Sequence, residues 1–464
     1  MERMRSLFYP RCVAVIGASD SPGKIGYNIL YSLIYGGFKG KIYPVNPRIK
    51  TVLGMRVYSS VNEIPDRIDL ALIGVNKNAA VEAIEQCGRL GTKGVICIAG
   101  GFRETGDEGL ALEKKLVEVT KKYDIKLVGP NTLGIINTEA SLDATFYPLR
   151  LNTGGVSIIA QSGGIGLQII KKLTDEGLGF NKWIAVGNRS VLEIADYLEY
   201  LSDDAGTKVI GIFLEGVDDA RRLVQVASEV ARRKPVVVYK VGQSDVVNYA
   251  AITHTGSMAG SHRLFRDIFN QFGILLVESV PELVAACKAL LLCPPAAGGR
   301  VGMYTYTAGP SITALDRLAE RKIDIPEFRA ETVFKIKSLL GENPLAVLKN
   351  PLDSAGVGNL AETYGKLAMT VLEDPNVDIL ATFCCVHKNW RNPTPELVDA
   401  ARKIRKPILA CYISTLQESE EDRKILQSAG IPLYNSPEEV AWGVAALAYY
   451  AAREGACGEG RFDY

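Results

Sequence analysis

The chain has 464 residues, which predicts about three domains, and 47% of them are hydrophobic, enough for several cores. Lysine and arginine number 53 and the acidic residues 52, so the net charge of +1 argues against broad electrostatic capture of nucleic acid or of an anionic membrane. Nine scattered cysteines without a C-x-x-C pair disfavour a zinc site or a disulfide framework, and they predict a protein of the reducing cytoplasm.

Short apolar runs alternate with amphipathic stretches through the first 130 residues. Five of these runs have the composition of buried strands: 12–16, 41–45, 70–75, 94–98 and 126–128. Two of the stretches between them have the period of helices: 79–90 and 108–121. Alternation of this kind predicts an α/β, Rossmann-like domain with a parallel sheet covered on both faces.

The rest of the chain contains a long repeat. The segment that begins at Val156 is matched by one that begins at Val301, 145 residues later, and the run after Lys234 is matched by the run after Lys406. Both copies end in an apolar helix that opens with the spacing of a capping box: Ser279 with Glu282, and Ser436 with Glu439. We therefore predict three domains, at 1–130, 151–293 and 299–464, the last two being similar three-layer α/β domains.

The two copies differ in length at one place. Pro235 and Gly273 are 38 positions apart, whereas Pro407 and Gly430 are 23 positions apart, so the first copy has 15 extra residues. The extra segment includes 242–260, which is rich in Gly, Ala, Ser and Thr. Long loops of such composition in compact domains are usually functional or disordered.

A glycine-containing turn, residues 17–26, follows the first strand and opens a helix, where backbone N–H groups can hold a phosphate. Ser19 replaces the second glycine of the Rossmann fingerprint, and the spacing is not that of a Walker loop. After the second strand, Arg48 and Lys50 stand where an NAD site needs an acidic residue. Coenzyme A or NADP therefore fits better than NAD, and a tight turn without a ligand is the alternative.

A second anion-binding turn is predicted at residues 161–164, again between a strand and a helix. Ser162 can cap the helix, and Gly163 and Gly164 let the backbone approach an anion closely. A plain helix cap is the alternative interpretation. The equivalent segment of the second copy, 307–311, has one glycine fewer and a proline, so it is a weaker candidate.

His254 lies in the inserted segment and is flanked by small residues. A lone histidine is usually structural, but an accessible imidazole beside anion-binding helix ends favours a nucleophile toward phosphorus. Glu215 ends a predicted strand at the carboxyl edge, and its carboxylate could fix the tautomer of that ring. The alternative for Glu215 is a surface acid at a strand end. His262 and His387 are assigned to structure.

Four strings together resemble the nucleoside-diphosphate-forming acyl-CoA synthetases: GPNTLG at 129–134, QSGG at 161–164, LEG at 214–216 and HTGSMAG at 254–260. The order and spacing cover the whole chain and are most similar to the α subunits of archaeal-type ADP-forming acetyl-CoA synthetases. The α subunit of succinyl-CoA synthetase resembles residues 1 to about 290 only. The resemblance implies a CoA-binding Rossmann-like domain followed by two flavodoxin-like, succinyl-CoA synthetase-type domains.

The resemblance also implies an activity and a set of site residues. A small acyl-CoA, ADP and phosphate would yield acid, ATP and CoA through an acyl phosphate and a phosphohistidine on His254, with Glu215 as its orienting partner. The phosphate loop would consist of Gln161, Ser162, Gly163 and Gly164. CoA would contact Gly17, Ser19, Ser21, Gly26, Asn46, Arg48, Val75, Asn76, Ala99, Gly100 and, at its thiol end, Asn131.

The nucleotide site is expected elsewhere, because the chain has neither a Walker loop nor an ATP-grasp pattern. The resemblance implies that an ATP-grasp β subunit holds ADP or ATP with Mg²⁺, in an α2β2 heterotetramer. Two features depart from the family pattern. Thr307 and its neighbours replace a Gly-rich loop, and this chain has Ala99 and Gly100 where succinyl-CoA synthetase has a carboxylate nearby.

Two other classes of function compete with this interpretation. One is a CoA-sensing or scaffolding subunit that has lost catalysis, against which the intact His254, Glu215 and Ser162 speak. The other is an NADP-linked dehydrogenase, which only the first domain suggests and whose fingerprint is absent from the sequence.

Overall fold

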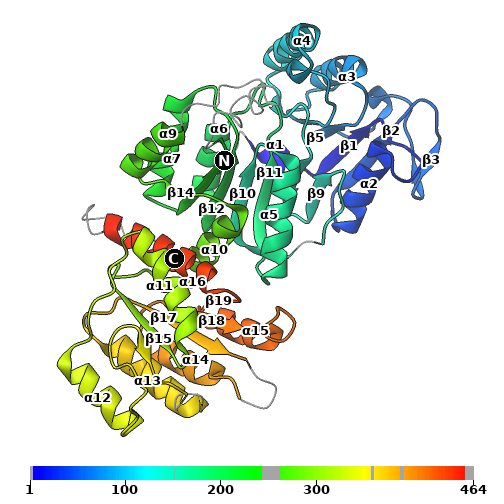
Figure 1. Ribbon diagram of the computed structural model, residues 1–464. Coiled ribbons are helices and arrows are strands. Elements are labelled where there is room, and N and C mark those ends of the chain that lie inside the picture. Colours follow the sequence, from blue (N-terminus) through cyan, green and yellow to red (C-terminus); the bar gives the residue numbers. More distant parts are fainter. Residues whose placement is uncertain (1–3, 151, 243–261, 357–359, 387–390, 455–464) are drawn as a thin grey trace. The chain divides into compact units, whose positions relative to one another are not determined.

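The computed structural model describes residues 4–150, 152–242, 262–356, 360–386 and 391–454 (Figure 1). The chain divides into two compact units, the first comprising Met1–Thr174 with Gly179–Leu276 and the second comprising Asp175–Leu178 with Val277–Tyr464. In the described residues, the first unit contains a five-stranded sheet, a seven-stranded sheet and a two-stranded ribbon, and the second unit contains a five-stranded sheet.

The first sheet is parallel throughout and confirms the predicted α/β architecture. Its strands, in sheet order, are β2 (Lys41–Val45), β1 (Cys12–Ile16), β5 (Leu70–Ile73), β6 (Gly94–Cys97) and β7 (Lys126–Val128). Val13 and Val15 pack in one core cluster with helix α2 (Ile25–Tyr35), whereas Ala14 and Ile16 pack in another with α3 (Lys77–Arg89) and α4 (Asp107–Tyr123). Both faces are thus buried, because alternate residues of a strand point to opposite sides.

The second sheet continues the first unit and carries a hairpin that the sequence patterns do not predict. Its strands, in order, are β14 (Leu275–Val277), β13 (Val236–Lys240), β12 (Val209–Leu214), β10 (Thr153–Ala160), β11 (Phe180–Ala185), β8 (Gly134–Asn137) and β9 (Leu142–Thr145). The β8–β9 hairpin pairs antiparallel with β11. The helices that connect the parallel strands are α5 (Gly163–Asp175), α6 (Ile194–Asp203), α7 (Ala220–Ala231) and α9 (His262–Phe272).

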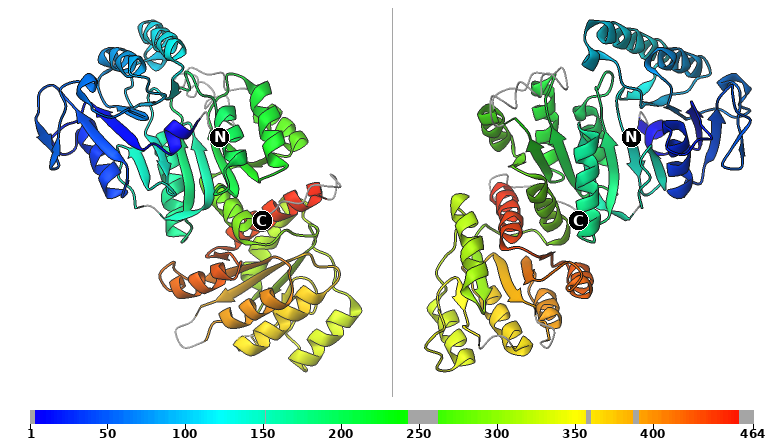
Figure 2. Two further views of the ribbon diagram at one scale, coloured as in Figure 1. Left: turned by 180° about the vertical axis from the view of Figure 1, so that it is seen from behind. Right: turned by 45° about the vertical axis from the view of Figure 1, so that its right-hand side comes forward.

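The third sheet has the same strand order as the parallel part of the second, which confirms the predicted repeat. Its strands, in order, are β16 (Leu352–Asp353), β15 (Val301–Thr305), β17 (Ile379–Cys385), β18 (Ile408–Ile413) and β19 (Leu433–Tyr434). Figure 2 shows helices on both of its faces. The helices of the second unit are α10 (Val280–Leu292), α11 (Ala308–Glu320), α12 (Ala330–Leu340), α13 (Ala361–Glu373), α14 (Thr394–Lys403), α15 (Glu420–Ser428) and α16 (Pro437–Glu454).

Two details concern helix α10 and the predicted capping boxes. Helix α10, predicted as the end of the second domain, belongs to the second compact unit, where it packs against α16. The serine half of each predicted capping box is present, because the Ser279 and Ser436 hydroxyls accept from the N–H groups of Glu282 and Glu439. The Glu282 carboxylate, however, accepts from the N–H of Glu278 at 2.9 Å, one residue before the helix cap.

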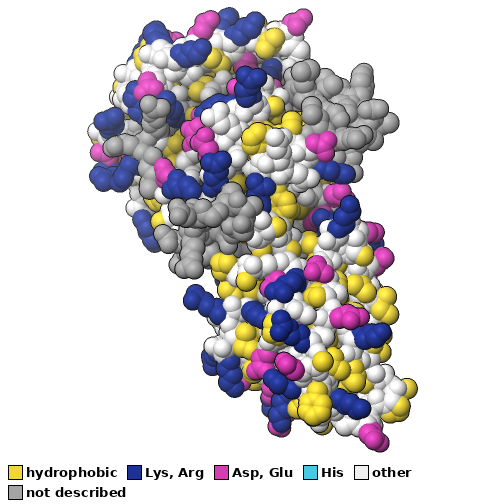
Figure 3. All heavy atoms as spheres, turned by 90° about the vertical axis from the view of Figure 1, so that its left-hand side faces the viewer, with side chains coloured by type: hydrophobic (Ala, Val, Ile, Leu, Met, Phe, Trp, Pro, Cys, Tyr) yellow, Lys and Arg dark blue, Asp and Glu magenta, His cyan; other side chains and the backbone are white. Residues whose placement is uncertain are grey.

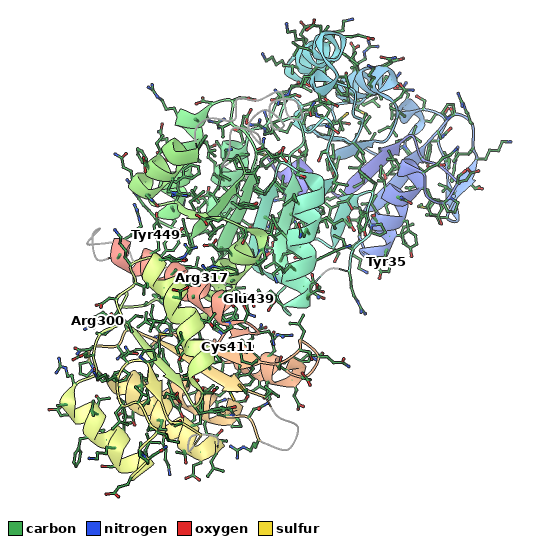
Figure 4. The ribbon with its side chains drawn as sticks, viewed as in Figure 1. Tyr35, Arg300, Arg317, Cys411, Glu439 and Tyr449 are labelled. Atoms are coloured by element: carbon green, nitrogen blue, oxygen red, sulfur yellow. The ribbon has the colours of Figure 1, made fainter. Side chains whose placement is uncertain are left out.

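The eight cysteines that the structure describes are all free thiols, and all except Cys385 are buried. Burial raises the pKa of the Cys87 and Cys287 thiols to about 12. Cys411, on β18 (Figure 4), is also buried, and burial raises its pKa well above the ordinary value. Thiols of this kind behave as small apolar side chains and are chemically inert.

The described surface mixes charges of both signs. Figure 3 shows Lys and Arg interspersed with Asp and Glu over the face that it presents, in keeping with the net charge of +1. Within the part of the chain that the structure describes, the helices fall short of the length and apolar character that crossing a bilayer requires.

Candidate functional site

The turn after β1 brings two backbone segments into direct contact. Gly17 has a φ of +88°, and a Cβ atom on it would lie 2.7 Å from Cγ1 of Val75. Gly26 lies in the first turn of α2, and a Cβ atom there would lie 1.9 Å from the carbonyl oxygen of Gly17. The turn can therefore close over the helix N-terminus only with glycine at both positions, which is the close approach that phosphate-binding turns of Rossmann-like folds use.

Asn46 fastens this turn to the loop that follows β2. Its side-chain amide donates to the carbonyl oxygen of Ala18 at 2.7 Å, and its side-chain oxygen accepts from the N–H of Arg48 at 2.8 Å. The Ser19 hydroxyl accepts from the N–H of Ser21 at 3.2 Å. Arg48 is exposed, so its guanidinium, which is predicted to meet a ribose phosphate, is accessible beside the turn.

The loops after β5, β6 and β7 complete this edge of the first sheet. Asn76 caps α3, because its side-chain oxygen accepts from the N–H of Ala79 at 3.1 Å. The carbonyl oxygen of Ala99 accepts from the N–H of Asn131 at 2.9 Å. A Cβ atom on the exposed Gly100 would lie 3.2 Å from the side-chain oxygen of Asn131. The residues predicted for the thiol end of CoA are therefore neighbours in the fold.

Replacing Gly26 with alanine is expected to weaken CoA binding about 5- to 150-fold, because the added methyl group must push the turn and the helix apart at a cost of about 1–3 kcal/mol. Calorimetric titration with CoA measures the loss. Gly309→Ala is the matched control, since nothing lies within 4 Å of the Cβ position there. Wild-type affinity in the Gly26→Ala variant would contradict the assignment of the turn.

The predicted phosphate loop is tied to the loop that carries Glu215. The side-chain oxygen of the buried Gln161 accepts from the N–H of Glu215 at 2.5 Å and from the N–H of Gly216 at 3.0 Å. Ser162 caps α5 weakly, with its hydroxyl 3.4 Å from the N–H of Ile165. The Gln161 oxygen thus fixes the loop, and the backbone of the α5 N-terminus, at Gly163 and Gly164, is the part suited to an anion.

The structure places Glu215 directly after β12, half-buried at the carboxyl edge of the second sheet. Its neighbour Leu214 is the register partner of Lys240, the last residue of β13. The chain therefore enters the inserted segment from the strand beside Glu215. His254 lies outside the described residues, so its approach to Glu215 stays a prediction.

Sequence reasoning missed a polar cluster around Asn188, in the loop after β11. The buried Asn188 amide donates to the carboxylates of Glu104 at 2.6 Å and Glu113 at 3.1 Å. Its side-chain oxygen lies 3.4 Å from the amide nitrogen of Asn131, and its N–H donates to the carbonyl oxygen of Pro130. Burial raises the pKa of Glu104, but hydrogen bonds from Asn188 and from backbone N–H groups outweigh it and hold the pKa below its usual value. The carboxylate stays charged beside the expected thiol end.

Two arginines connect this cluster to the Glu215 loop. The Arg103 guanidinium donates to the carbonyl oxygen of Asn188, and one of its nitrogens lies 3.5 Å from the carboxylate of Asp218. Arg189 approaches the same Asp218 oxygen at 3.5 Å. Asp218 comes three residues after Glu215, so the loop bearing Glu215 is held from both sheets of the unit. Single polar residues in loops form no recognisable sequence pattern. The one signal that could have identified them is their position after strands, at the carboxyl edge of the sheet.

Lys240 is a further charged group that the sequence patterns did not single out. Its side chain is fully buried, with the ammonium 5.3 Å from the ring centre of Phe265 and donating to the carbonyl oxygen of Val241. Burial lowers its pKa to about 8, and the Glu215 carboxylate opposes that shift. The described edge of β12 and β13 therefore holds a carboxylate and an ammonium close enough to influence each other.

Comparison with known proteins agrees with this geometry. Residues 153–290 match the model of a succinyl-CoA ligase like flavodoxin domain, and residues 11–138 match the model of a CoA binding domain. The α subunit of acetate–CoA ligase [ADP-forming] II of Pyrococcus furiosus is 39% identical over 456 residues, which cover 97% of this chain and 98% of that protein. Acetate–CoA ligase [ADP-forming] I of Archaeoglobus fulgidus is 38% identical over 97% of this chain and 64% of its own length.

A solved structure extends the likeness to three dimensions. The "dinucleotide forming" acetyl-coenzyme A synthetase 1 of Ca. Korarchaeum cryptofilum, in complex with phosphate and ADP, superimposes with a TM-score of 0.89 and 33% identity over 98% of both chains. Together with the end-to-end match to the Pyrococcus furiosus α subunit, this shows that the chain belongs to the family of ADP-forming acetate–CoA ligase α subunits.

Proposed function

We propose that this chain is the α subunit of an ADP-forming acyl-CoA synthetase that converts acyl-CoA, ADP and phosphate to acid, ATP and CoA, with acetyl-CoA as the leading substrate. The observation that carries the proposal is the pair of hydrogen bonds that the Gln161 side-chain oxygen accepts from the N–H groups of Glu215 and Gly216. It joins a phosphate-binding loop to the carboxylate expected to orient the nucleophile His254. The match to α subunits named for this reaction supports the same conclusion.

CoA would bind across the carboxyl edge of the first sheet. The turn at Gly17 and Gly26 offers the α2 N-terminus to its phosphates, and Asn46 positions the backbone of Arg48 so that the exposed guanidinium can meet the ribose phosphate. The thiol end would reach Gly100 and Asn131, beside the Asn188 cluster. The matching of residues 11–138 to a CoA binding domain supports this placement.

The chemistry follows from these positions in two steps. A phosphate oxygen attacks the thioester carbonyl, the C–S bond breaks, and the thiolate leaves to be protonated as CoA, which yields an acyl phosphate. An imidazole nitrogen of His254 then attacks phosphorus, the bond to the acyl oxygen breaks, and the carboxylate departs. The N–H groups at the α5 N-terminus neutralise charge on the phosphoryl oxygens, and the Glu215 carboxylate stabilises the ring that becomes cationic.

We assign ADP or ATP and Mg²⁺ to a partner, an ATP-grasp β subunit in an α2β2 heterotetramer. This chain has no Walker loop or ATP-grasp pattern, and it spans 64% of the Archaeoglobus fulgidus relative, so a part of that longer polypeptide has no counterpart here. Phosphoryl transfer from histidine needs a second site that positions the nucleotide. The magnesium ion, when bound, would neutralise the charge of the nucleotide phosphates.

The division into domains at 1–130, 151–293 and 299–464 and the cytoplasmic location belong to this proposal as well. The equal strand order of the second and third sheets supports two ligase domains of one type. Free, buried thiols such as Cys87 suit a reducing compartment.

Reconstitution with the β subunit tests the proposal. We expect acyl-CoA, ADP and phosphate to give ATP and CoA in equal amounts, only when both subunits are present, and a panel of acyl-CoA esters identifies the preferred acid. The isolated chain should acquire no phosphate from ATP and Mg²⁺. Full ATP-dependent labelling of the isolated chain would refute the division of labour, and CoA binding without any ATP formation would indicate a sensing or scaffolding subunit instead.

A further inference from the structure

A cavity lies at the edge of the first sheet opposite the turn at Gly17 and Gly26. Its volume is about 720 Å³, and it is lined by helix α1 (Arg5–Phe8) and by the residues that lead into β1, β5, β6 and β7. In a parallel sheet these amino ends share one edge. The five residues of β1 separate it from Gly17 by roughly 16 Å, so the cavity is distinct from the proposed reaction site.

The lining of this amino-edge cavity is strongly basic. Five cationic side chains surround it, with two acidic ones, in a chain whose net charge is only +1: Arg5, Arg11, Arg67, Lys93 and Lys126, with Asp69 and Asp124. Like charges gathered in this way repel one another unless a counter-charge is bound. An anion bound in the cavity would therefore lower the free energy of the folded protein, because it offsets the repulsion between these cationic side chains.

The two acids are already engaged. Asp124 lies 3.0 Å from the ammonium of Lys126 and 3.7 Å from that of Lys93. A carboxylate oxygen of Asp69 accepts from the N–H groups of Arg11 at 2.8 Å and Cys12 at 3.2 Å. Among the described residues, no carboxylate forms an ion pair with the guanidinium groups of the three lining arginines, Arg5, Arg11 and Arg67.

We propose that the amino-edge cavity binds a phosphate-rich anion of the polyphosphate or nucleotide class. Guanidinium groups match phosphate oxygens in a bidentate fashion, and three of them suit several phosphates better than one. The volume lies within the range of about 300–1,000 Å³ that is usual for small-molecule sites. This site would be additional to the CoA, phosphate and nucleotide sites of the proposed reaction.

The cavity also adjoins a polar contact between the two sheets of the unit, in which Tyr9 and Glu139 are exposed and Lys182 is buried. Tyr9 lines it, and the Tyr9 hydroxyl donates to Glu139 at 2.6 Å, whose carboxylate lies 3.3 Å from the ammonium of Lys182 on β11. An anion held beside Tyr9 is therefore in contact with the polar groups that connect α1 to the second sheet. Binding should raise the thermal stability of the chain, and above the Kd the gain should grow with the logarithm of the ligand concentration.

Titration of the full chain with tripolyphosphate, at saturating CoA, tests the proposal. Calorimetry and thermal unfolding should show saturable binding that weakens as salt rises. We expect the double variant Arg5→Gln/Arg67→Gln to bind at least about tenfold more weakly, because it lacks two of the three guanidinium groups that can form charge-assisted hydrogen bonds to phosphate oxygens. Arg317→Gln, an exposed arginine on α11 (Figure 4), is the matched control and should bind like the wild type.

Titration with other anions identifies which type of phosphate compound the cavity binds. Pyrophosphate and orthophosphate measure how many phosphates are needed, and ATP without magnesium shows whether a base adds affinity. If the double variant is unstable, the single variants Arg5→Gln and Arg67→Gln are titrated in its place. The proposal would be overturned if binding were not saturable or if the variants bound as tightly as the wild type. Loss of binding when the β subunit is added would also overturn it, because the cavity would then belong to a subunit interface.

Discussion

Replacing His254 with asparagine is expected to reduce ATP formation by the reconstituted enzyme at least about a thousandfold. Asparagine keeps a polar side chain of similar reach but has no nitrogen lone pair able to attack phosphorus, so the phosphoryl group has no carrier between the acyl phosphate and ADP. A coupled assay for ATP, with acyl-CoA, phosphate and ADP, measures the rate. Acid-labile phosphate on the chain should disappear in parallel.

Two controls make that result specific. His262→Asn, at the start of α9, changes another histidine that we assign to structure, and it should retain most of the activity. CoA affinity of the His254→Asn variant should equal that of the wild type, because the turn at Gly17 and Gly26 is built from other elements. A His254→Asn enzyme that keeps more than about a tenth of the wild-type rate would rule out the phosphohistidine.

Replacing Lys182 with methionine is expected to destabilise the protein by about 3–5 kcal/mol. The fully buried Lys182 ammonium donates to both carboxylate oxygens of Asp204 at 2.8 Å and lies over the rings of Tyr9 and Tyr200. Methionine fills the volume of the side chain but leaves the buried Asp204 carboxylate without its counter-charge. The shift in the urea unfolding midpoint, with the slope unchanged, measures the loss.

The neighbourhood of Lys182 supplies the controls. Lys171→Met removes an exposed lysine of α5 that stacks on Tyr147, and it should cost less than about 1 kcal/mol. The double variant Lys182→Met/Asp204→Leu should recover part of the loss, because no unpaired charge then stays buried. A Lys182→Met protein as stable as the wild type would show that the buried ion pair contributes nothing.

Much of the fold was predictable because the apolar pattern and the turn residues agree. The strands at 12–16, 41–45 and 126–128 match the structure residue for residue, since each is a short apolar run between polar turns. The β8–β9 hairpin was not predictable in this way. Its strands have four residues each, and what defines them is antiparallel pairing with the distant β11.

The candidate site likewise has a part that the sequence could predict and a part that it could not. Gly17 and Gly26 were predictable because only glycine permits the close approach that the turn requires, and the structure shows that approach. Asn188 and Arg103 were not, because tertiary packing alone brings them to the carboxyl edge. The assignment of His254 remains a prediction from its small-residue setting and from the family resemblance.

The transfer of phosphorus through this chain can be followed directly. The reconstituted enzyme is incubated with acyl-CoA and ³²P-orthophosphate without ADP, digested, and analysed for labelled peptides, and ADP with Mg²⁺ is then added to a parallel sample. We predict label on the peptide containing His254 and its quantitative passage into ATP when ADP is added. Label on another residue, or ATP formed from labelled phosphate without any labelled His254, would contradict the account.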